Sequence, residues 1–562
     1  METRLQGRRG VVLRGATLVD GTGSPRVSGT DATVRIDGDT ISAVGEAAAV
    51  DRWPDDEVVD LDGLVLAPGF VDVHTHYDAQ VLWDPDLTPS CWHGVTTVVI
   101  GNCGFGIAPT RPADRDTMAR ILENVEGMSV EALRAGIRWD FETFPEYLDV
   151  IDGLPLRLNV AALLGHTPVR QYVMGDDASE REATADEVDR MCAIVTEGMR
   201  AGAAGFASSQ LITHVGDAGK PVPSRLAGAG EVRRLCDAVG AHGSGVLMTT
   251  IGAPLDFEDF AAIAASTGRP LIWNSLLTRK GADGQALALL ERPGAATGGV
   301  WPQIACRPLV FSFNLADPFP VGALPVFAEV LERAHADRAT LYADAGWRER
   351  ARPQMEAAWS GRWGDAIVDE SPTRPEAVGR SLADLANADG KRPFDVLVDI
   401  SLADGLQTRI RFVLVNDDED EIAALLADDR TVLGLSDAGA HASQLCDACF
   451  STHLLARFVR ERGDLTLERA VWHLTGHPAA LYELDGRGVV RPGAKADLVA
   501  FDPATVAPAA LDRVWDLPAG ADRLIAGSEG VEHVWVGGVR IRRDGEDVDP
   551  EMPAGRLLRG GV

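Results

Sequence analysis

The sequence predicts an α/β protein in which a (β/α)8 TIM-like barrel is joined to a β-sandwich built from both ends of the chain. Two patterns support this prediction. The middle of the chain, about residues 66–480, alternates apolar strand-like runs with helical patterns, as a parallel barrel requires. The segments on either side contain short strands separated by turns. At 562 residues the chain is long enough for a large barrel with an appended module.

The N-terminal segment contains short strand-like runs, at residues 11–13, 17–19, 33–36 and 41–44. An Asp-Gly-Asp sequence separates the last two runs and predicts a hairpin. The C-terminal segment has a similar pattern, with runs at residues 497–501, 531–536 and 539–541. We therefore expect residues 1–65 and 485–562 to form one composite β-sandwich, with the barrel at residues 66–484.

Apolar runs that end in polar residues mark the expected barrel strands. These runs occupy residues 64–73, 95–100, 158–164, 202–209, 245–250, 270–276 and 432–436. The segment 300–395 interrupts this pattern with prolines and tryptophans among charged residues. We expect that segment to be an insertion over the barrel mouth.

The composition argues against several kinds of partner. The net charge of −31 argues against nucleic acid and anionic membranes, because phosphate binding needs clustered lysine and arginine. No apolar run approaches the ~20 residues of a membrane helix, and the first residues carry no secretory signal. Seven cysteines without regular spacing indicate a reduced, cytoplasmic protein. The sequence leaves a homo-oligomer open.

The first expected barrel strand ends in the motif Pro-Gly-Phe-Val-Asp-Val-His-Thr-His-Tyr-Asp, residues 68–78. Alternate residues of a strand point to the same side, so His74 and His76 project together from its end. Paired imidazoles suit zinc and related metals. The alternative is two polar residues in an ordinary turn.

The second expected strand continues as Gly-Val-Thr-Thr-Val-Val-Ile-Gly-Asn-Cys-Gly, residues 94–104, and brings Cys103 to the same barrel end. The two motifs together resemble those of the amidohydrolase superfamily and, within it, the N-acyl-D-amino-acid deacylases (D-aminoacylases). The resemblance covers nearly the whole chain and is weakest at residues 210–400. It implies that this cysteine is a metal ligand, whereas a small apolar core residue is the alternative.

The last expected strand ends in Gly-Leu-Ser-Asp-Ala-Gly-Ala-His, residues 434–441, which resembles the Ser-Asp motif of the same family. The resemblance implies that Asp437 contacts the metal and serves as general base, whereas a helix N-cap is the alternative. In a closed barrel the last strand neighbours the first, and the first neighbours the second. His74, His76, Cys103 and Asp437 would then form one arc with enough ligands for one Zn²⁺ ion.

Two features of the family are missing. Its members carry further histidines on the fifth and sixth strands, where this chain has Thr250 and Ser275. They also carry a substrate-binding lysine where this chain has Leu277. No histidine lies between His242 and His335 that could replace them. We therefore expect a single zinc ion per chain rather than a pair.

Four further residues are candidates for contact with the metal or the substrate. His166, His214 and His441 follow expected strand ends, although each could be structural. Arg307 could hold a substrate carboxylate, a task for which a bidentate arginine is well suited.

The sequence thus favours a zinc-dependent hydrolase of a non-peptide C–N bond, acting on a small amide. The resemblance implies an N-acyl-(D-)amino acid as substrate, attacked by a metal-activated water with Asp437 as base. Two alternatives remain open. One is a hydrolase of a cyclic amide, imide or lactone, and the other is a catalytically degenerate barrel that binds a ligand.

Overall fold

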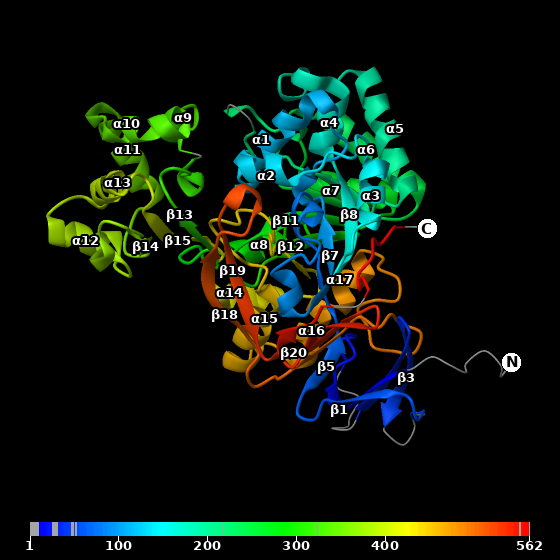
Figure 1. Cartoon of the computed structure of the whole chain (residues 1–562). Coiled ribbons are helices and arrows are strands. Elements are labelled where there is room, and N and C mark those ends of the chain that lie inside the picture. Colours follow the sequence, from blue (N-terminus) through cyan, green and yellow to red (C-terminus); the bar gives the residue numbers. More distant parts are fainter. Residues whose placement is uncertain are drawn as a thin grey trace.

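The computed structural model of the chain describes residues 10–24, 32–46, 50, 53–216, 219–322, 324–549 and 552–560. It contains three parts, which Figure 1 shows side by side. These are a barrel of parallel strands with its helices, a β-sheet made from both ends of the chain, and a separate lobe of helices and short strands.

The barrel is an eight-stranded parallel sheet in which the spatial order of the strands follows the chain. Its strands are β6 (Phe70–Asp72), β7 (Val95–Ile100), β8 (Asn159–Gly165), β9 (Gly205–Ser208), β10 (Val246–Thr250), β11 (Leu271–Leu276), β12 (Val300–Ile304) and β16 (Val432–Leu433). Nearly all of their residues are buried, as expected for parallel strands that are covered on both faces. A parallel bridge between Thr75 and Ala438 connects the segments that follow β6 and β16. The first, second and last strands therefore meet, as the sequence predicts.

The seventh strand differs from the sequence prediction, which places residues 300–304 in the insertion. In the structure these residues are β12, and Pro302 pairs with Trp273 of β11. Proline lacks the N–H that a central strand normally donates, so its presence argues against a strand when only the sequence is read. The insertion starts after this strand rather than at residue 300.

Helices surround the barrel strands. They are α1 (Arg115–Glu126), α2 (Val130–Gly136), α3 (Phe144–Asp152), α4 (His166–Met174), α5 (Ala185–Ala201), α6 (Ala229–His242), α7 (Phe257–Thr267), α8 (Gln285–Leu290), α14 (Glu419–Ala427), α15 (Phe450–His453), α16 (Leu467–Leu474) and α17 (Gly476–Leu481). The longest, α5, shows why such segments form helices: Thr184 and Glu187 build a capping box at its start, and Gly202 ends it with φ 104°. None of the described helices has the length and apolarity needed to cross a membrane.

Both ends of the chain contribute to one nine-stranded sheet. Its strands are β1 (Val11–Leu18), β2 (Ala32–Asp37), β3 (Thr40–Glu46), β4 (Glu57–Asp60), β5 (Val65–Pro68), β17 (Leu498–Phe501), β20 (Val531–Val536), β21 (Val539–Arg543) and β22 (Glu546–Asp547). The N- and C-terminal segments join where β17 pairs antiparallel with β5. A further ribbon pairs β18 (Ala507–Val514) with β19 (Arg523–Glu529). The expected hairpin lies between β2 and β3. The division of the chain into domains at the predicted boundaries stays a prediction.

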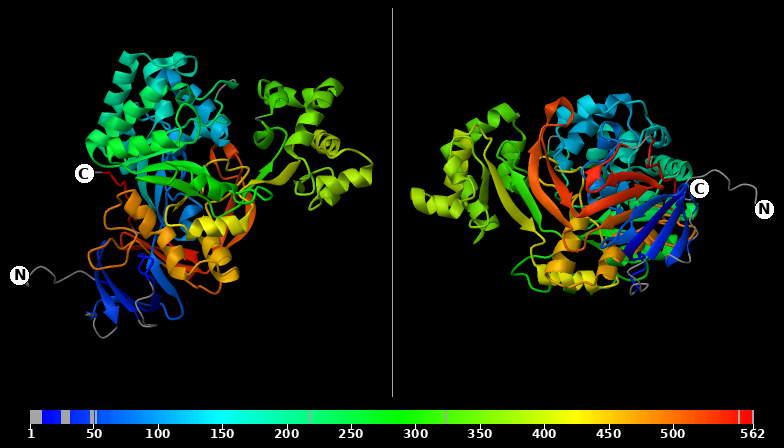
Figure 2. Two further views of the ribbon diagram at one scale, coloured as in Figure 1. Left: turned by 180° about the vertical axis from the view of Figure 1, so that it is seen from behind. Right: turned by 60° about the horizontal axis from the view of Figure 1, so that its bottom comes forward.

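The lobe has its own hydrophobic core and stands to one side of the barrel (Figure 2). It contains β13 (Leu309–Phe313), β14 (Ile367–Glu370), β15 (Arg409–Val415), α9 (Pro325–Leu331), α10 (His335–Ala343), α11 (Ala345–Ala358), α12 (Leu382–Asp389) and α13 (Pro393–Ala403). In this core the ring of Trp359 stacks on Phe412, with centroids 4.3 Å apart. The Ser312 amide donates a 2.7 Å hydrogen bond to the Gln444 carbonyl, which lies in the loop after β16. The lobe therefore contacts the end of the barrel at which Asp437 lies.

Candidate metal centre

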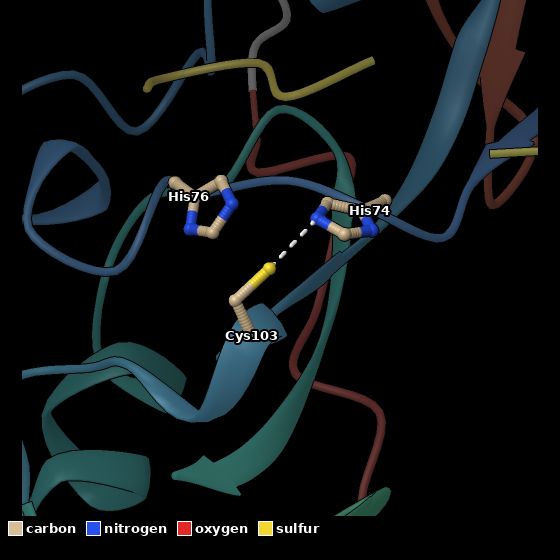
Figure 3. Close-up of side chains that lie close together, drawn as sticks. All are labelled: His74, His76 and Cys103. Carbon is tan, nitrogen blue, oxygen red and sulfur yellow. Dashed lines mark hydrogen bonds between the residues drawn. The ribbon is translucent and has the colours of Figure 1, made fainter. Parts of the chain in front are cut away.

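Three buried side chains converge at the C-terminal end of the barrel. His74 and His76 follow β6, Cys103 follows β7, and ligand atoms of all three lie within 4.8 Å of one another (Figure 3). The Cys103 sulfur lies 3.4 Å from Nε2 of His74. Two imidazoles and one thiol at such distances can bind a single zinc ion.

Asp437 completes this group from the loop after β16. Its Oδ1 lies 3.2 Å from Nε2 of His74 and 3.8 Å from Nε2 of His76. The four residues that the sequence predicts as ligands therefore lie together, in the segments that follow three neighbouring strands. We call them the ligand arc: His74, His76, Cys103 and Asp437.

The backbone is constrained where it presents two of these residues. Cys103 has φ 54° and Asp437 has φ 46°, both in the left-handed region that L-residues seldom occupy. Gly101, just before Cys103, has φ 85°, and a Cβ there would lie 2.2 Å from the carbonyl oxygen of Leu163. Such conformations cost about 1 kcal/mol or more each and tend to occur at functional sites.

The second nitrogen of each histidine faces a polar side chain that the sequence motifs do not reveal. Nδ1 of His74 lies 2.6 Å from Oε1 of Gln303, on β12. Nδ1 of His76 lies 3.4 Å from Oε1 of Glu126, the last residue of α1. Partners on Nδ1 leave Nε2 of both rings directed at the centre, as in metal sites where outer residues orient the ligands.

A signal in the sequence could have pointed to Glu126 but not to Gln303. Gln303 lies in β12, and Pro302 in the same segment argues against a central strand when only the sequence is read. Glu126 is an anion at a helix C-terminus, where the helix dipole disfavours negative charge. An acidic residue in that place indicates a partner that offsets the unfavourable interaction with the helix dipole.

The centre is rich in buried acid groups. Burial raises the pKa of Asp72 and Asp78 to about 7 and also raises the pKa of Glu126 and Asp437. Within the described parts of the chain, no lysine or arginine lies at ion-pair distance from these carboxylates, and their ion-pair contacts are to histidines. Burial lowers the pKa of His74 and His76, which keeps both rings in the neutral form that binds metals. The donor set thus fits a divalent cation.

The positions of the missing histidines hold neutral groups. Oγ1 of Thr250 accepts hydrogen bonds of 2.8 and 3.0 Å from the amides of Gln210 and Leu211. On β11 it is Asn274, one residue before the expected Ser275, that reaches the centre, with Nδ2 3.3 Å from the Cys103 sulfur. Oδ1 of Asn274 is buried without a hydrogen-bond partner among the described residues. Neither position offers an imidazole.

Two further predicted candidates lie near the ligand arc. Nδ1 of His214 lies 2.6 Å from the Ser209 hydroxyl, and burial lowers the pKa of His214 to about 3. The His441 ring packs against Phe311 of the lobe, with centroids 5.4 Å apart. Neither belongs to the group of residues whose ligand atoms converge.

The remaining two candidates are held in other contacts. His166 lies between the Ser208 hydroxyl, 2.8 Å from Nδ1, and Glu231, 2.9 Å from Nε2. Arg307 donates a 2.8 Å hydrogen bond from Nε to Asp447. These contacts favour structural roles, since the charge of Arg307 is already matched.

The chain resembles known proteins over almost its whole length. A model of the Amidohydrolase family matches residues 57–542. The D-aminoacylase of Alcaligenes xylosoxydans xylosoxydans is 31% identical over 507 residues, which cover 88% of this chain and 89% of that protein.

Two solved structures are also similar. A D-aminoacylase with a binuclear metal centre is 27% identical with a TM-score of 0.66, and the match covers 98% of this chain and 99% of that one. The N-acyl-D-glutamate deacylase of Bordetella bronchiseptica, in complex with zinc and a phosphonate inhibitor, is 26% identical with a TM-score of 0.66, covering 98% and 100%.

These similarities confirm three predictions: the barrel fold, the resemblance to the D-aminoacylases, and the enzyme class, a hydrolase of C–N bonds other than peptide bonds. By the extent of the family match, this chain belongs to the amidohydrolase family.

Proposed function

We propose that this chain is a zinc-dependent deacylase that hydrolyses the amide bond of a small N-acyl amino acid, with a preference for the D configuration. The observation that carries the proposal is the ligand arc, in which two neutral imidazoles, a thiol and a carboxylate meet at the barrel end. The similarity to D-aminoacylases supports the substrate class.

The ligand arc would hold one metal ion. The two nitrogens, the sulfur and one oxygen are enough ligands for zinc. Thr250 of β10 and Asn274 of β11, which come from the neighbouring strands where the family carries histidines, offer no imidazole. Zinc bound there would lower the pKa of a water molecule and polarise the scissile carbonyl.

Asp437 would move the proton. Its carboxylate accepts a proton from the attacking water as the water oxygen bonds to the amide carbon. As the C–N bond breaks, Asp437 returns that proton to the leaving nitrogen, so the products are a carboxylic acid and an amine. Asp437 is placed for this role, because its Oδ1 lies 3.2 Å from Nε2 of His74 and 3.8 Å from Nε2 of His76, beside the position that the metal would take.

A second candidate function is the hydrolysis of a cyclic amide, imide or lactone. Leu277 replaces the lysine expected to bind a substrate carboxylate, and Arg307 is paired with Asp447. A substrate without a free carboxylate would need neither cation. The same water attack and proton transfer by Asp437 would open its ring.

A substrate panel separates these functions. The zinc-loaded protein would be assayed with N-acetyl-D-amino acids, their L-enantiomers, hydantoins and small lactones, beside the Asp437→Asn variant. Turnover of D-configured N-acyl amino acids that the variant lacks supports the first function. Turnover of the cyclic compounds alone supports the second. No turnover of any substrate, with ligand binding retained, would favour the degenerate barrel.

The cytoplasmic location and a homo-oligomer stay predictions from the sequence.

A further inference from the structure

Glu126 is a buried carboxylate at the centre that the proposed mechanism does not use. Its residue is 4% exposed, and its Oε1 lies 3.4 Å from Nδ1 of His76, slightly longer than an ordinary hydrogen bond. No other ion pair involves Glu126 in the described ranges of the chain. A carboxylate in such a place needs a partner that offsets the cost of its burial.

The chain holds Glu126 in place through the backbone. The amide of His441 donates a hydrogen bond to the Glu126 carbonyl, which ties the end of α1 to the loop that carries Asp437. Gly127 follows with φ 57°, and a Cβ there would lie 2.6 Å from Nδ1 of His441. The glycine permits this close approach, so α1 and the loop are fixed to each other beside His76.

The two histidines of the ligand arc are supported differently. His74 faces the neutral amide of Gln303, whereas His76 faces the carboxylate of Glu126. A carboxylate on the far nitrogen of a ligating histidine fixes the tautomer and the ring orientation, and it increases the basicity of the other nitrogen. Its negative charge also stabilises a nearby cation directly.

The negative charge of Glu126 matters for metal binding because the side chains that β10 and β11 contribute at the barrel mouth are neutral. Thr250 is bonded to backbone amides, and Asn274 presents an amide to Cys103. Whatever binds at the ligand arc therefore receives no imidazole from these two positions. Glu126 lies outside the ring of barrel strands, and its negative charge is placed to offset the absence of these imidazoles.

We propose, on the basis of the zinc-binding function above, that Glu126 is a positioning residue that accepts the Nδ1 proton of His76 and strengthens metal binding at Nε2. Glu126 acts through His76 and not as a ligand. It allows a centre with one histidine pair to retain its metal.

The test measures zinc affinity by chelator competition and the unfolding midpoint of the metal-free protein. The variants are Glu126→Gln, which keeps an acceptor without charge, and Glu126→Leu, which removes both. Glu123→Gln is the matched control, one turn earlier on the same helix and half-buried. Outer partners of ligating histidines are typically worth about 10- to 100-fold in affinity. We expect a loss of about 10-fold for the glutamine, about 100-fold for the leucine and none for the control.

The metal-free unfolding midpoint distinguishes positioning from folding. Removal of an uncompensated buried carboxylate should leave this midpoint unchanged or raise it, while zinc binding weakens. The proposal is overturned if both Glu126 variants bind zinc as the wild type does. It is also overturned if weaker zinc binding is accompanied by a fall in the unfolding midpoint of the metal-free protein, because a damaged fold would then explain the lost affinity. Should the leucine variant not fold, the glutamine variant decides. A wild type that binds no zinc would overturn the proposed function as well, whereas unchanged variants beside a zinc-binding wild type overturn only this inference.

Discussion

The two sides of the barrel mouth carry side chains of very different kinds. On the side of β6, β7 and β16, the ligand arc brings together groups that can bind a cation: two imidazoles, a thiol and a carboxylate. On the side of β10 and β11, Thr250 is saturated by backbone amides and Asn274 donates toward Cys103.

This difference indicates how far metal binding can extend in this barrel. A hydroxyl that already accepts two amide hydrogen bonds is part of the structure and is not free to take a metal. An amide nitrogen next to a thiol can stabilise its sulfur but cannot replace an imidazole. We therefore expect substitutions on the side of β6, β7 and β16 to alter metal binding and catalysis, and substitutions on the side of β10 and β11 to alter stability.

The largest expected effect is on catalysis and comes from the ligand arc. Asp437→Asn keeps the size of the side chain but removes the base, so kcat should fall by about 1,000-fold or more. The measurement is steady-state hydrolysis of the best substrate from the panel. Asp420→Asn, at an exposed carboxylate, is the control and should keep full activity. Activity retained in Asp437→Asn would remove Asp437 from the mechanism.

His93 lies outside both sides of the barrel mouth and tests whether burial alone keeps an imidazole neutral in this protein. His93 is buried, with Nδ1 2.9 Å from the Thr452 hydroxyl and Nε2 3.0 Å from the Ala526 carbonyl. Burial lowers its pKa from 6.5 to about 4. Between these pH values the unfolded chain binds a proton that the folded chain does not, so stability falls as the pH falls. The contribution of His93 should be about 3 kcal/mol across this range.

Denaturant unfolding of the wild type and of His93→Gln, from pH 7 to pH 4, checks this prediction. The variant should be less stable at pH 7 and should lose less stability on acidification. An identical pH dependence in both proteins would show that His93 is already charged when folded, and burial would then not be enough to keep an imidazole neutral in this protein.

A smaller effect is expected for the neutral partner of His74. Gln303→Leu removes the acceptor that lies 2.6 Å from Nδ1 of His74. Zinc affinity should fall by about 10-fold, because the ring loses its orienting contact. Chelator competition measures the change. An unchanged affinity would mean that packing alone orients this ring.

The smallest effect should come from the opposite side of the mouth. Thr250→Val keeps the shape but leaves the amides of Gln210 and Leu211 without their acceptor. We expect a loss of about 1–2 kcal/mol in the free energy of unfolding and no change in zinc content. Denaturant unfolding and metal analysis of the same samples test both. A fall in zinc content without a loss of stability would place Thr250 in the metal site.

The sequence predicted the ligand arc because its signals are local. Each of its motifs follows an apolar run, and barrel closure brings the first, second and last strands together. The strand run before Cys103 and the His-x-His pair are visible without knowledge of any distant contact. The same holds for the hairpin between β2 and β3.

The sequence could not predict contacts that depend on long-range packing. Gln303 reaches His74 across 229 positions of the chain, from a strand that a proline disguises. Glu126 reaches His76 only because α1 ends beside the loop of Asp437. His166 stands at a strand end, as predicted, but Glu231 holds it from 65 positions away in the chain.

The most direct test of a single metal site is the zinc content per chain of the wild type, His74→Ala and Cys103→Ala, each purified without chelator. We expect about one zinc ion per chain in the wild type and almost none in either variant, because each variant removes a ligand of a single site. Two zinc ions in the wild type, or a full ion retained in either variant, would contradict the claim that one arc of the barrel holds one metal.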